Sequence, residues 1–271
     1  MTAQAARLPA GYQAARLPAG HYGFRHVARM EWIKLRSLRS TWWTLALSAA
    51  AAVGIGIAVG LNTPFTSRHE DLTSNALGGV SAGLLLAGVL GVLMMTSEYT
   101  SGMIRATLAA APNRRLMLAA KAAVFGAVAL ALGEATSFIA FLTGGAALRH
   151  GITAPTLSQP GALRAVLLTG VSFCLIGLLG MGLGAIIRHT AAAVAVMVGG
   201  VYVAAQAVAA FAHPLLPYLP IPIVANSLSA SRPMTHDVPA PLSPWAGLGL
   251  LCLYAVVLLA AGGWLLCRRD A

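Results

Sequence analysis

Six long apolar segments, separated by shorter polar ones, limit the possible folds of this chain more than any other feature. Each segment is 20 to 23 residues long, and together they cover residues 42–61, 76–96, 122–142, 165–187, 191–212 and 245–266. About 20 apolar residues in a helix span the roughly 30 Å hydrocarbon core of a bilayer. Backbone N–H and C=O groups in lipid must be paired within the segment, so these segments are expected to be helices. The sequence therefore predicts an all-α polytopic membrane protein with a six-span domain over residues 41–271.

The composition also favours a membrane protein. Hydrophobic residues make up 58% of the chain and charged residues 9%, with a mean hydropathy of +0.78. Soluble domains carry about 25% charged residues. The six segments contain one formally charged residue, Glu134. A charge within the membrane is costly, so Glu134 is a weak candidate for a substrate or proton site. The alternative is a protonated carboxyl that is hydrogen-bonded to Thr136, Ser137 or a neighbouring helix.

The distribution of arginine and lysine predicts the orientation in the membrane. Six spans place both termini on the same side, where twelve basic residues flank the spans, against four on the other side. Cytoplasmic loops carry the excess of basic residues, so both termini are expected to be cytoplasmic. The net charge of +11 is explained in this way and does not indicate binding to nucleic acid.

The segment before the first span has two parts. Residues 1–21 contain two copies of QAARLPAG and no signal-peptide core, so they are expected to form a disordered tail. Residues 22–40 are predicted to form an interfacial amphipathic helix, with apolar side chains in the acyl boundary and arginines toward anionic headgroups. A plain basic anchor would explain the arginines but not the apolar face. That helix would carry Phe24, Val27, Ala28, Leu35 and Leu38 on one face, beside Arg25, Arg29 and Arg36.

A polar stretch, residues 97–121, separates the second and third spans on the predicted cytoplasmic side. A short, partly apolar helix is expected at about residues 98–111, with Ser97 as its cap and Glu98 in its first turn. Pro112 would end it. A short helix held against the membrane is suited to receive movement from another protein. The alternative is a connector that only keeps the chain inside.

The last external loop, residues 213–244, holds eight of the fourteen prolines. Residues 221–230 within it are apolar enough to form a short re-entrant piece that dips back into the membrane. Irregular backbone at that depth must be covered by protein, so this piece would cap the outer mouth of the bundle. An ordinary surface loop is the alternative.

Motifs for catalysis or cofactor binding are scarce. The only lysines are Lys34 and Lys121, and neither follows a glycine, so the chain has no P-loop for ATP. The cysteines and histidines lack the spacing of a metal or disulfide site, and no bound cofactor is expected. Residues 79–83 match GxSxG around Ser81, but they open a membrane span instead of a strand–turn–helix.

Four segments carry a resemblance to a known family. Residues 31–43 (EWIKLRSLRSTWW) resemble the N-terminal motif of bacterial ABC-2 type exporter permeases, especially those of high-G+C bacteria. Residues 97–108 (SEYTSGMIRATL) resemble that family's segment after the second span. Residues 184–190 (GAIIRHT) resemble its tight turn, and residues 219–228 its outer re-entrant stretch. The sixteen arginines against two lysines are typical of such genomes.

This resemblance implies a function and a set of partners. It implies a permease subunit in the bacterial plasma membrane that exports a hydrophobic or amphipathic substrate and is not itself an enzyme. Two cytoplasmic ATPase subunits would bind ATP and Mg, and a second permease, identical or different, would complete a dimer that encloses the pathway. The N-terminal helix would also contact the ATPase. The resemblance assigns ATPase coupling to Glu98, Tyr99, Gly102, Met103, Ile104, Arg105, Thr107 and Leu108.

The alternative function is a six-span membrane protein without an ATPase. It would be either a secondary transporter or an intramembrane serine hydrolase acting through Ser81. Secondary transporters commonly show internal repeats, interrupted helices and several intramembrane polar groups. The spans of this chain carry Glu134 as their one formal charge and show no internal repeat.

Overall fold

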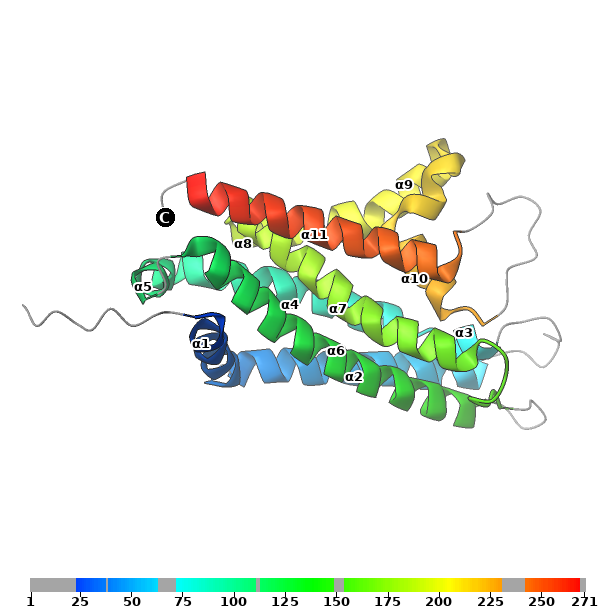
Figure 1. The fold of residues 1–271 in the computed structure, drawn as a ribbon. Coiled ribbons are helices and arrows are strands. Elements are labelled where there is room, and N and C mark those ends of the chain that lie inside the picture. The colour runs from blue at the N-terminus through cyan, green and yellow to red at the C-terminus, as the bar shows by residue number, and fades with distance from the viewer. Residues whose placement is uncertain are drawn as a thin grey trace, which may run out of the picture.

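The computed structural model describes residues 23–37, 39–62, 72–110, 113–148, 154–230 and 242–268, and all regular elements in these ranges are helical (Figure 1). The predicted disordered tail and residues 231–241 of the last loop lie outside these ranges. The helices are α1 (Phe24–Ser37), α2 (Arg39–Asn62), α3 (Leu72–Ala76), α4 (Val80–Thr100), α5 (Met103–Ala110), α6 (Arg114–Ala146), α7 (Ala162–Ile187), α8 (Thr190–Val196), the π-helix η1 (Met197–Val203), α9 (Ala204–Phe211), the 3-10 helix η2 (His213–Tyr218), α10 (Pro220–Leu228) and α11 (Pro244–Arg268).

Five of these helices are long and apolar enough to cross a membrane: α2, α4, α6, α7 and α11. The class predicted from the sequence, an all-α multi-pass membrane protein, is confirmed to this extent. α6 has 33 residues and extends beyond its predicted apolar segment at both ends, from Arg114 to Ala146. Asn113 caps this start by accepting a hydrogen bond from the backbone N–H of Leu116 at 3.1 Å.

The remaining predicted span, residues 191–212, is helical but divided. α8, η1 and α9 follow one another without a break, and the middle third has π geometry. Gly199 and Gly200 lie in that π segment, and no atom outside the local backbone lies within 4 Å of a Cβ built on either of them. Glycine has a low helix propensity, and π segments are local departures from the α-helix that often accompany functional sites. A sixth span therefore stays a prediction, with η1 as its irregular centre.

α7 occupies the middle of the bundle and packs against α4, α6 and α11. Glycines make the contact with α4 close: a Cβ on Gly91 would meet the carbonyl oxygen of Gly177, and a Cβ on Gly180 would meet that of Gly88. Small residues allow transmembrane helices to approach until van der Waals contacts hold them together. The α4–α7 pair is thus the closely packed centre of the fold.

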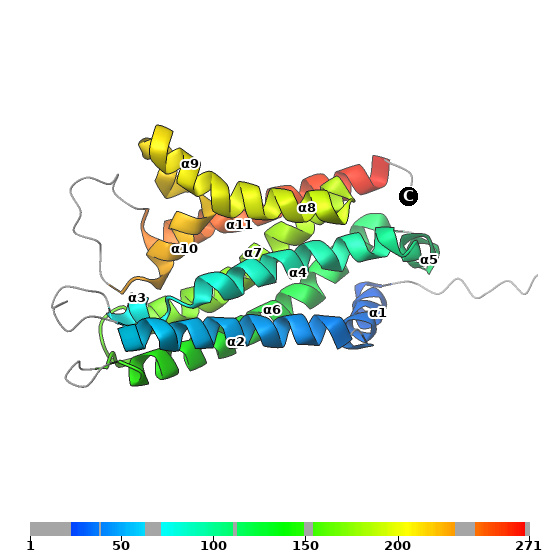
Figure 2. The ribbon, with the colours of Figure 1, turned by 180° about the vertical axis from the view of Figure 1, so that it is seen from behind.

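The short helices mark the two ends of the bundle. α1 and α5 lie at one end, next to the end of α11, and both run crosswise to the long helices (Figures 1 and 2). α3 and α10 lie at the opposite end in both views. The described chain therefore begins and ends at the same end of the bundle.

α10 corresponds to the predicted re-entrant piece. It is a regular helix whose residue Ile223 packs against Gly247, about one turn into α11. Arg164, at the start of α7, donates to the carbonyl oxygen of Ser229 at 2.8 Å, just after α10 ends. These contacts fold α10 back beside the first turns of α7 and α11, although insertion into the membrane stays a prediction.

Replacing Gly91 with alanine should destabilise the protein by about 1–3 kcal/mol, because the added methyl group overpacks the α4–α7 contact. Gly249→Ala in α11 is the matched control, since the space around Gly249 is open and alanine there favours the helix by about 1 kcal/mol. Thermal unfolding midpoints measured in one detergent compare the two variants. Equal midpoints would show that the bundle does not depend on this close approach.

Candidate functional site

The polar stretch between α4 and α6 does contain a short helix, but it starts later than the sequence suggested. α4 continues to Thr100, and Gly102 follows in the left-handed conformation at φ +68°, so α5 begins at Met103. Glycine at this position commonly ends a helix, since it lacks the Cβ that disfavours positive φ. The prediction that Ser97 caps the short helix is wrong, because Ser97 lies within α4 and its carbonyl oxygen accepts at 3.0 Å from the N–H of Ser101, the residue directly after α4.

Glu98 and Tyr99 therefore belong to the last turn of α4, and not to the first turn of α5 as predicted. The other proposed coupling residues fall on α5 or directly before it. Ile104 and Thr107 are buried, whereas Met103 and Arg105 are exposed. α5 thus has one face against the bundle and one open face, and Leu108 is half-buried between them.

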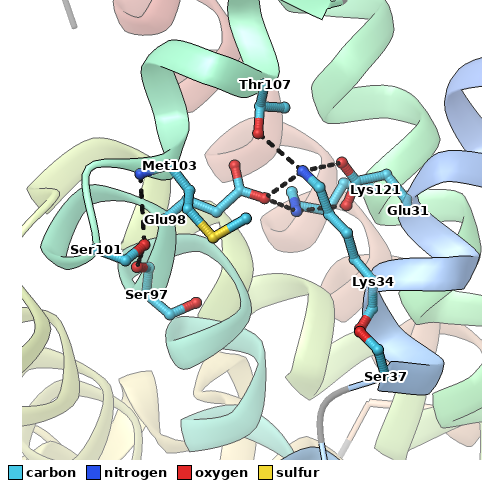
Figure 3. Close-up of polar contacts among 9 residues, drawn as sticks. All are labelled: Glu31, Lys34, Ser37, Ser97, Glu98, Ser101, Met103, Thr107 and Lys121. Carbon is cyan, nitrogen blue, oxygen red and sulfur yellow. Dashed lines mark hydrogen bonds and ion pairs between the residues drawn. The ribbon is translucent and has the colours of Figure 1, made fainter.

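The buried face of α5 lies over a cluster of four charged residues, named here the charged cluster: Glu31, Lys34, Glu98 and Lys121 (Figure 3). Lys121 Nζ on α6 lies 2.5 Å from Glu31 Oε2 on α1 and 2.7 Å from Glu98 Oε1 on α4. Lys34 Nζ lies 3.1 Å from the same Glu98 oxygen and 3.4 Å from Glu31 Oε1. Two lysine ammonium groups and two carboxylates from three helices therefore form one network of ion pairs.

Thr107 connects α5 to the charged cluster. Lys34 Nζ donates a hydrogen bond to Thr107 Oγ1 at 2.8 Å, from α1 to α5 (Figure 3). Lys34 therefore contacts acceptors on three helices, α1, α4 and α5. Its side chain is 22% exposed, whereas Lys121 and Glu31 are only 2% and 1% exposed. Lys121 forms the enclosed part of the cluster, and Lys34 forms its accessible edge.

The charged cluster determines which helices meet at this end of the bundle and how they are positioned. Removing a charge from water carries a large free-energy cost, which is recovered only where opposite charges and hydrogen bonds surround the group. Both lysines have two carboxylate partners, and each carboxylate is shared between both lysines. Any movement that separates α1, α4 or α6 would break at least one of these pairs.

Sequence reasoning assigned Glu98 to the site but missed the other three members of the charged cluster. Lys34 and Lys121 were counted as signals of membrane orientation, and Glu31 was given no role. One signal was available, because Glu31 lies between Val27 and Leu35 at intervals of four residues, on the apolar face of its helix. An acid in that position indicates a buried partner.

The same arrangement corrects the prediction for the N-terminal helix. Val27, Glu31 and Leu35 are buried and face the bundle, where α1 packs on α6. The acyl boundary is therefore not where Val27 and Leu35 lie, although the sequence placed them there. Of the predicted apolar face, Val27 and Leu35 contact protein, Phe24 is exposed, and Leu38 lies outside the described residues.

Beside the charged cluster, two arginines form hydrogen bonds with the end of α11. Arg114 Nη1 donates to the carbonyl oxygen of Leu266 at 2.7 Å, and Arg188 Nη2 donates to that of Leu265 at 3.1 Å. The last carbonyls of a helix have no partner within it, so these bonds complete the end of α11. The Arg188 guanidinium also lies 5.3 Å from the centre of the Tyr99 ring. Tyr99 thus links α4 to this second network.

Glu134 lies in the middle of α6, half-buried beside Gly170 of α7, where a Cβ on Gly170 would meet its carboxyl group. Its Oε2 atom is buried and has no hydrogen-bond partner among the described residues. Ser137, one of the partners considered above, donates instead to the carbonyl oxygen of Val166 at 2.7 Å. The geometry assigns no ligand to Glu134, and a substrate or proton role stays a hypothesis.

The GxSxG match has a packing explanation. A Cβ on Gly79 would meet the Ala52 carbonyl oxygen of α2, and a Cβ on Gly83 would meet the Phe173 ring of α7 at 2.8 Å. Both glycines thus permit close helix contacts. The Ser81 hydroxyl donates to the carbonyl oxygen of Gly78 at 3.2 Å, which is a local bond at the start of α4. This geometry lends no support to a serine nucleophile.

A small cavity of about 10 Å³ lies inside the bundle, between α2, α4, α6 and α7. It is lined mainly by apolar side chains and also by Ser48 and Thr136. A volume of this size holds about one water molecule, which is far too little for a transported molecule. No group of three or more potential metal ligands of the His, Cys, Asp and Glu types occurs within the described part of the chain.

No protein-family model matches the sequence, and no curated protein matches it significantly. The resemblance to exporter permeases therefore rests on the four quoted segments and their order along the chain.

Lys121→Met should lower the free energy of unfolding by about 3–5 kcal/mol, because two carboxylates lose their enclosed partner. The double variant Glu31→Met/Lys121→Met should recover most of that loss, because the remaining Lys34 and Glu98 still balance each other. Replacing a buried ion pair by apolar side chains is often neutral. Unfolding midpoints in detergent measure both effects. A double variant as unstable as the single one would show that pairing does not determine the role of Lys121.

Proposed function

We propose that this chain is the membrane-spanning permease subunit of an ATP-driven ABC exporter. The observation that carries the proposal is α5, a short helix at one end of the bundle with an open face. The opposite face of α5 is joined through Thr107 to the charged cluster, which contacts α1, α4 and α6. A force applied to α5 by a partner would therefore act on three other helices.

The energy source in this proposal is a separate protein. The chain lacks a P-loop, so ATP and Mg would be bound by two cytoplasmic ATPase subunits docked on α5. The open face of α5 includes Met103, Arg105 and Ala106, and Gly102 precedes it as a sharp turn. This open face carries both apolar and basic side chains, and a short helix with such a face can dock in a groove of a soluble protein.

The transport pathway is proposed to lie between two permease subunits. The cavity between α2, α4, α6 and α7 is too small for a substrate, and α2 is the least buried of the five long helices. With α8, η1 and α9 counted as the fifth of six spans, both termini would be cytoplasmic in the bacterial plasma membrane. A hydrophobic or amphipathic molecule fits the apolar composition of these surfaces, and the second subunit is either the same chain or a related one.

The charged cluster gives this proposal a mechanical route. ATP binding would close the ATPase pair and displace α5, and Lys34 would pass the displacement to α1 through its bond to Thr107. One residue separates the end of α1 from the start of α2, so α2 would follow. α2 has few internal contacts to oppose such a movement compared with α7.

Ala106→Trp on the open face of α5 should abolish co-purification of an ATPase, because the indole would block docking without disturbing the buried face. A substitution at Gly102 would be less informative, since a side chain there adds the strain of the left-handed backbone. The measurement is a mild-detergent pull-down of the tagged protein from its own host, with mass spectrometry of the bound proteins.

The matched control for that experiment is Ala246→Trp, an exposed position at the start of α11, at the other end of the bundle. It should retain a stoichiometric P-loop protein. If the unmodified chain purifies without an ATPase in several detergents, the exporter proposal fails, and a six-span protein acting alone becomes the better explanation.

Lys34→Met should leave the ATPase bound but disconnect it from α1. In the purified complex, ATP should change the amide hydrogen exchange of α1 and early α2, and this change should be lost in the methionine variant. Lys34→Arg, which keeps the charge, should retain part of the response. An ATP response in Lys34→Met equal to that of the unmodified complex would remove Lys34 from the route.

A further inference from the structure

The face of α1 that points away from the bundle, named here the arginine face, is basic and has no exposed acid. Arg25, Arg29 and Arg36 are all exposed and fall in one row along the helix, which has 3.6 residues per turn. Arg39 is also exposed and follows at the start of α2. The one acid of α1, Glu31, is buried on the opposite face in the charged cluster. The positive charge of the arginine face is therefore not balanced on its own helix.

Large apolar side chains border this row of arginines. Trp32 is 42% exposed and Ile33 is 58% exposed, and their helix positions lie on either side of the row. Trp42 and Trp43, at the start of α2, are exposed as well. The apolar border thus continues from α1 into the first long apolar helix.

The position of α1 places this face at the edge of the membrane. α1 ends at Ser37, α2 begins at Arg39, and the apolar part of α2 starts at Thr41. α1 also lies crosswise to α2 (Figures 1 and 2). A helix joined so closely to a membrane span, and perpendicular to it, runs along the membrane surface at the depth of the lipid headgroups.

We propose that the arginine face binds acidic phospholipids through their phosphate groups. Guanidinium groups form paired hydrogen bonds with phosphate oxygens, and several basic residues in a row add their attraction to an anionic leaflet. Tryptophan favours the interface between headgroups and acyl chains, which matches Trp32 and Trp43. This inference depends on α1 and the membrane alone, and it does not require the exporter function.

A soluble partner fits this face less well than a lipid surface does. The arginines are bordered by exposed Trp32 and Ile33, and the same apolar border leads into α2, which is long and apolar enough to cross a membrane. An ATPase surface would have to be acidic and also cover this apolar border next to the membrane. A lipid leaflet offers phosphate groups at its surface for the arginines and acyl chains beneath them for the apolar side chains.

Trp32 provides a reporter of lipid contact within the face itself. The full chain, with the other four tryptophans replaced by phenylalanine, is reconstituted into phosphatidylcholine vesicles. These vesicles contain a small fraction of brominated phosphatidylglycerol or, as the reference, brominated phosphatidylcholine. Bromine quenches tryptophan fluorescence on contact, so the two titrations compare affinities at this face. We expect phosphatidylglycerol to be favoured at least about fivefold, the effect of a single basic residue near an anionic surface.

Arg29→Gln/Arg36→Gln should reduce this preference at least about fivefold. The matched control is Arg115→Gln/Arg268→Gln, which removes two exposed arginines from other helices at the same end of the bundle and should keep the preference. Equal Trp32 emission in pure phosphatidylcholine verifies that both variants are folded around α1.

Three results would overturn the inference. One is the absence of any preference in the unmodified chain, and another is an equal loss in both double variants, which would indicate the general surface charge. The third is a retained lipid preference in Arg29→Gln/Arg36→Gln together with loss of a co-purifying ATPase. In that case the arginine face would be a protein docking surface.

Discussion

Three buried charges, with a fourth at their accessible edge, determine how the helices meet at one end of this molecule. Glu31, Lys34, Glu98 and Lys121 come from three helices that are distant in sequence, and each makes contact with at least two oppositely charged groups in the cluster. A buried charge without a partner is far more costly than a lost apolar contact. The cluster therefore fixes the relative positions of α1, α4 and α6, and it sets where α5 can lie through Thr107.

The rest of the bundle is held by a different kind of contact, with different mechanical consequences. The α4–α7 contact depends on glycines such as Gly91 and Gly177, whose close packing has no charged groups to direct it. Such contacts are held by steric fit, whereas the charged cluster holds its helices through ion pairs that must break before the helices separate. The helix ends joined by the charged cluster are thus suited to move together as one unit.

Features that depend on local composition could be predicted from the sequence. Features that depend on contacts between residues distant in the chain could not. Apolar length identified the long helices, because crossing a bilayer imposes that length directly. The end of α4 was misplaced, since Glu98 suits the start of a helix as well as a buried ion pair, and only the left-handed Gly102 decides between them. The surroundings of Val27 and Leu35 in α1 were predicted wrongly, because these side chains suit lipid and protein equally. Their true side is set by Lys121, 90 residues away from Glu31.

The different chemistry of lysine and arginine matches the contacts that each makes in this molecule. Sixteen basic residues are arginines, and both lysines of the chain lie in the charged cluster. A lysine ammonium is a compact charge with three donors that can point to acceptors on different helices, as Lys34 does toward Glu31, Glu98 and Thr107. The planar arginine fork is better matched to a phosphate or to paired carbonyl oxygens at a helix end. Lysine is thus found where three helices converge on one point, whereas Arg114 and Arg188 bond to the end of a single helix.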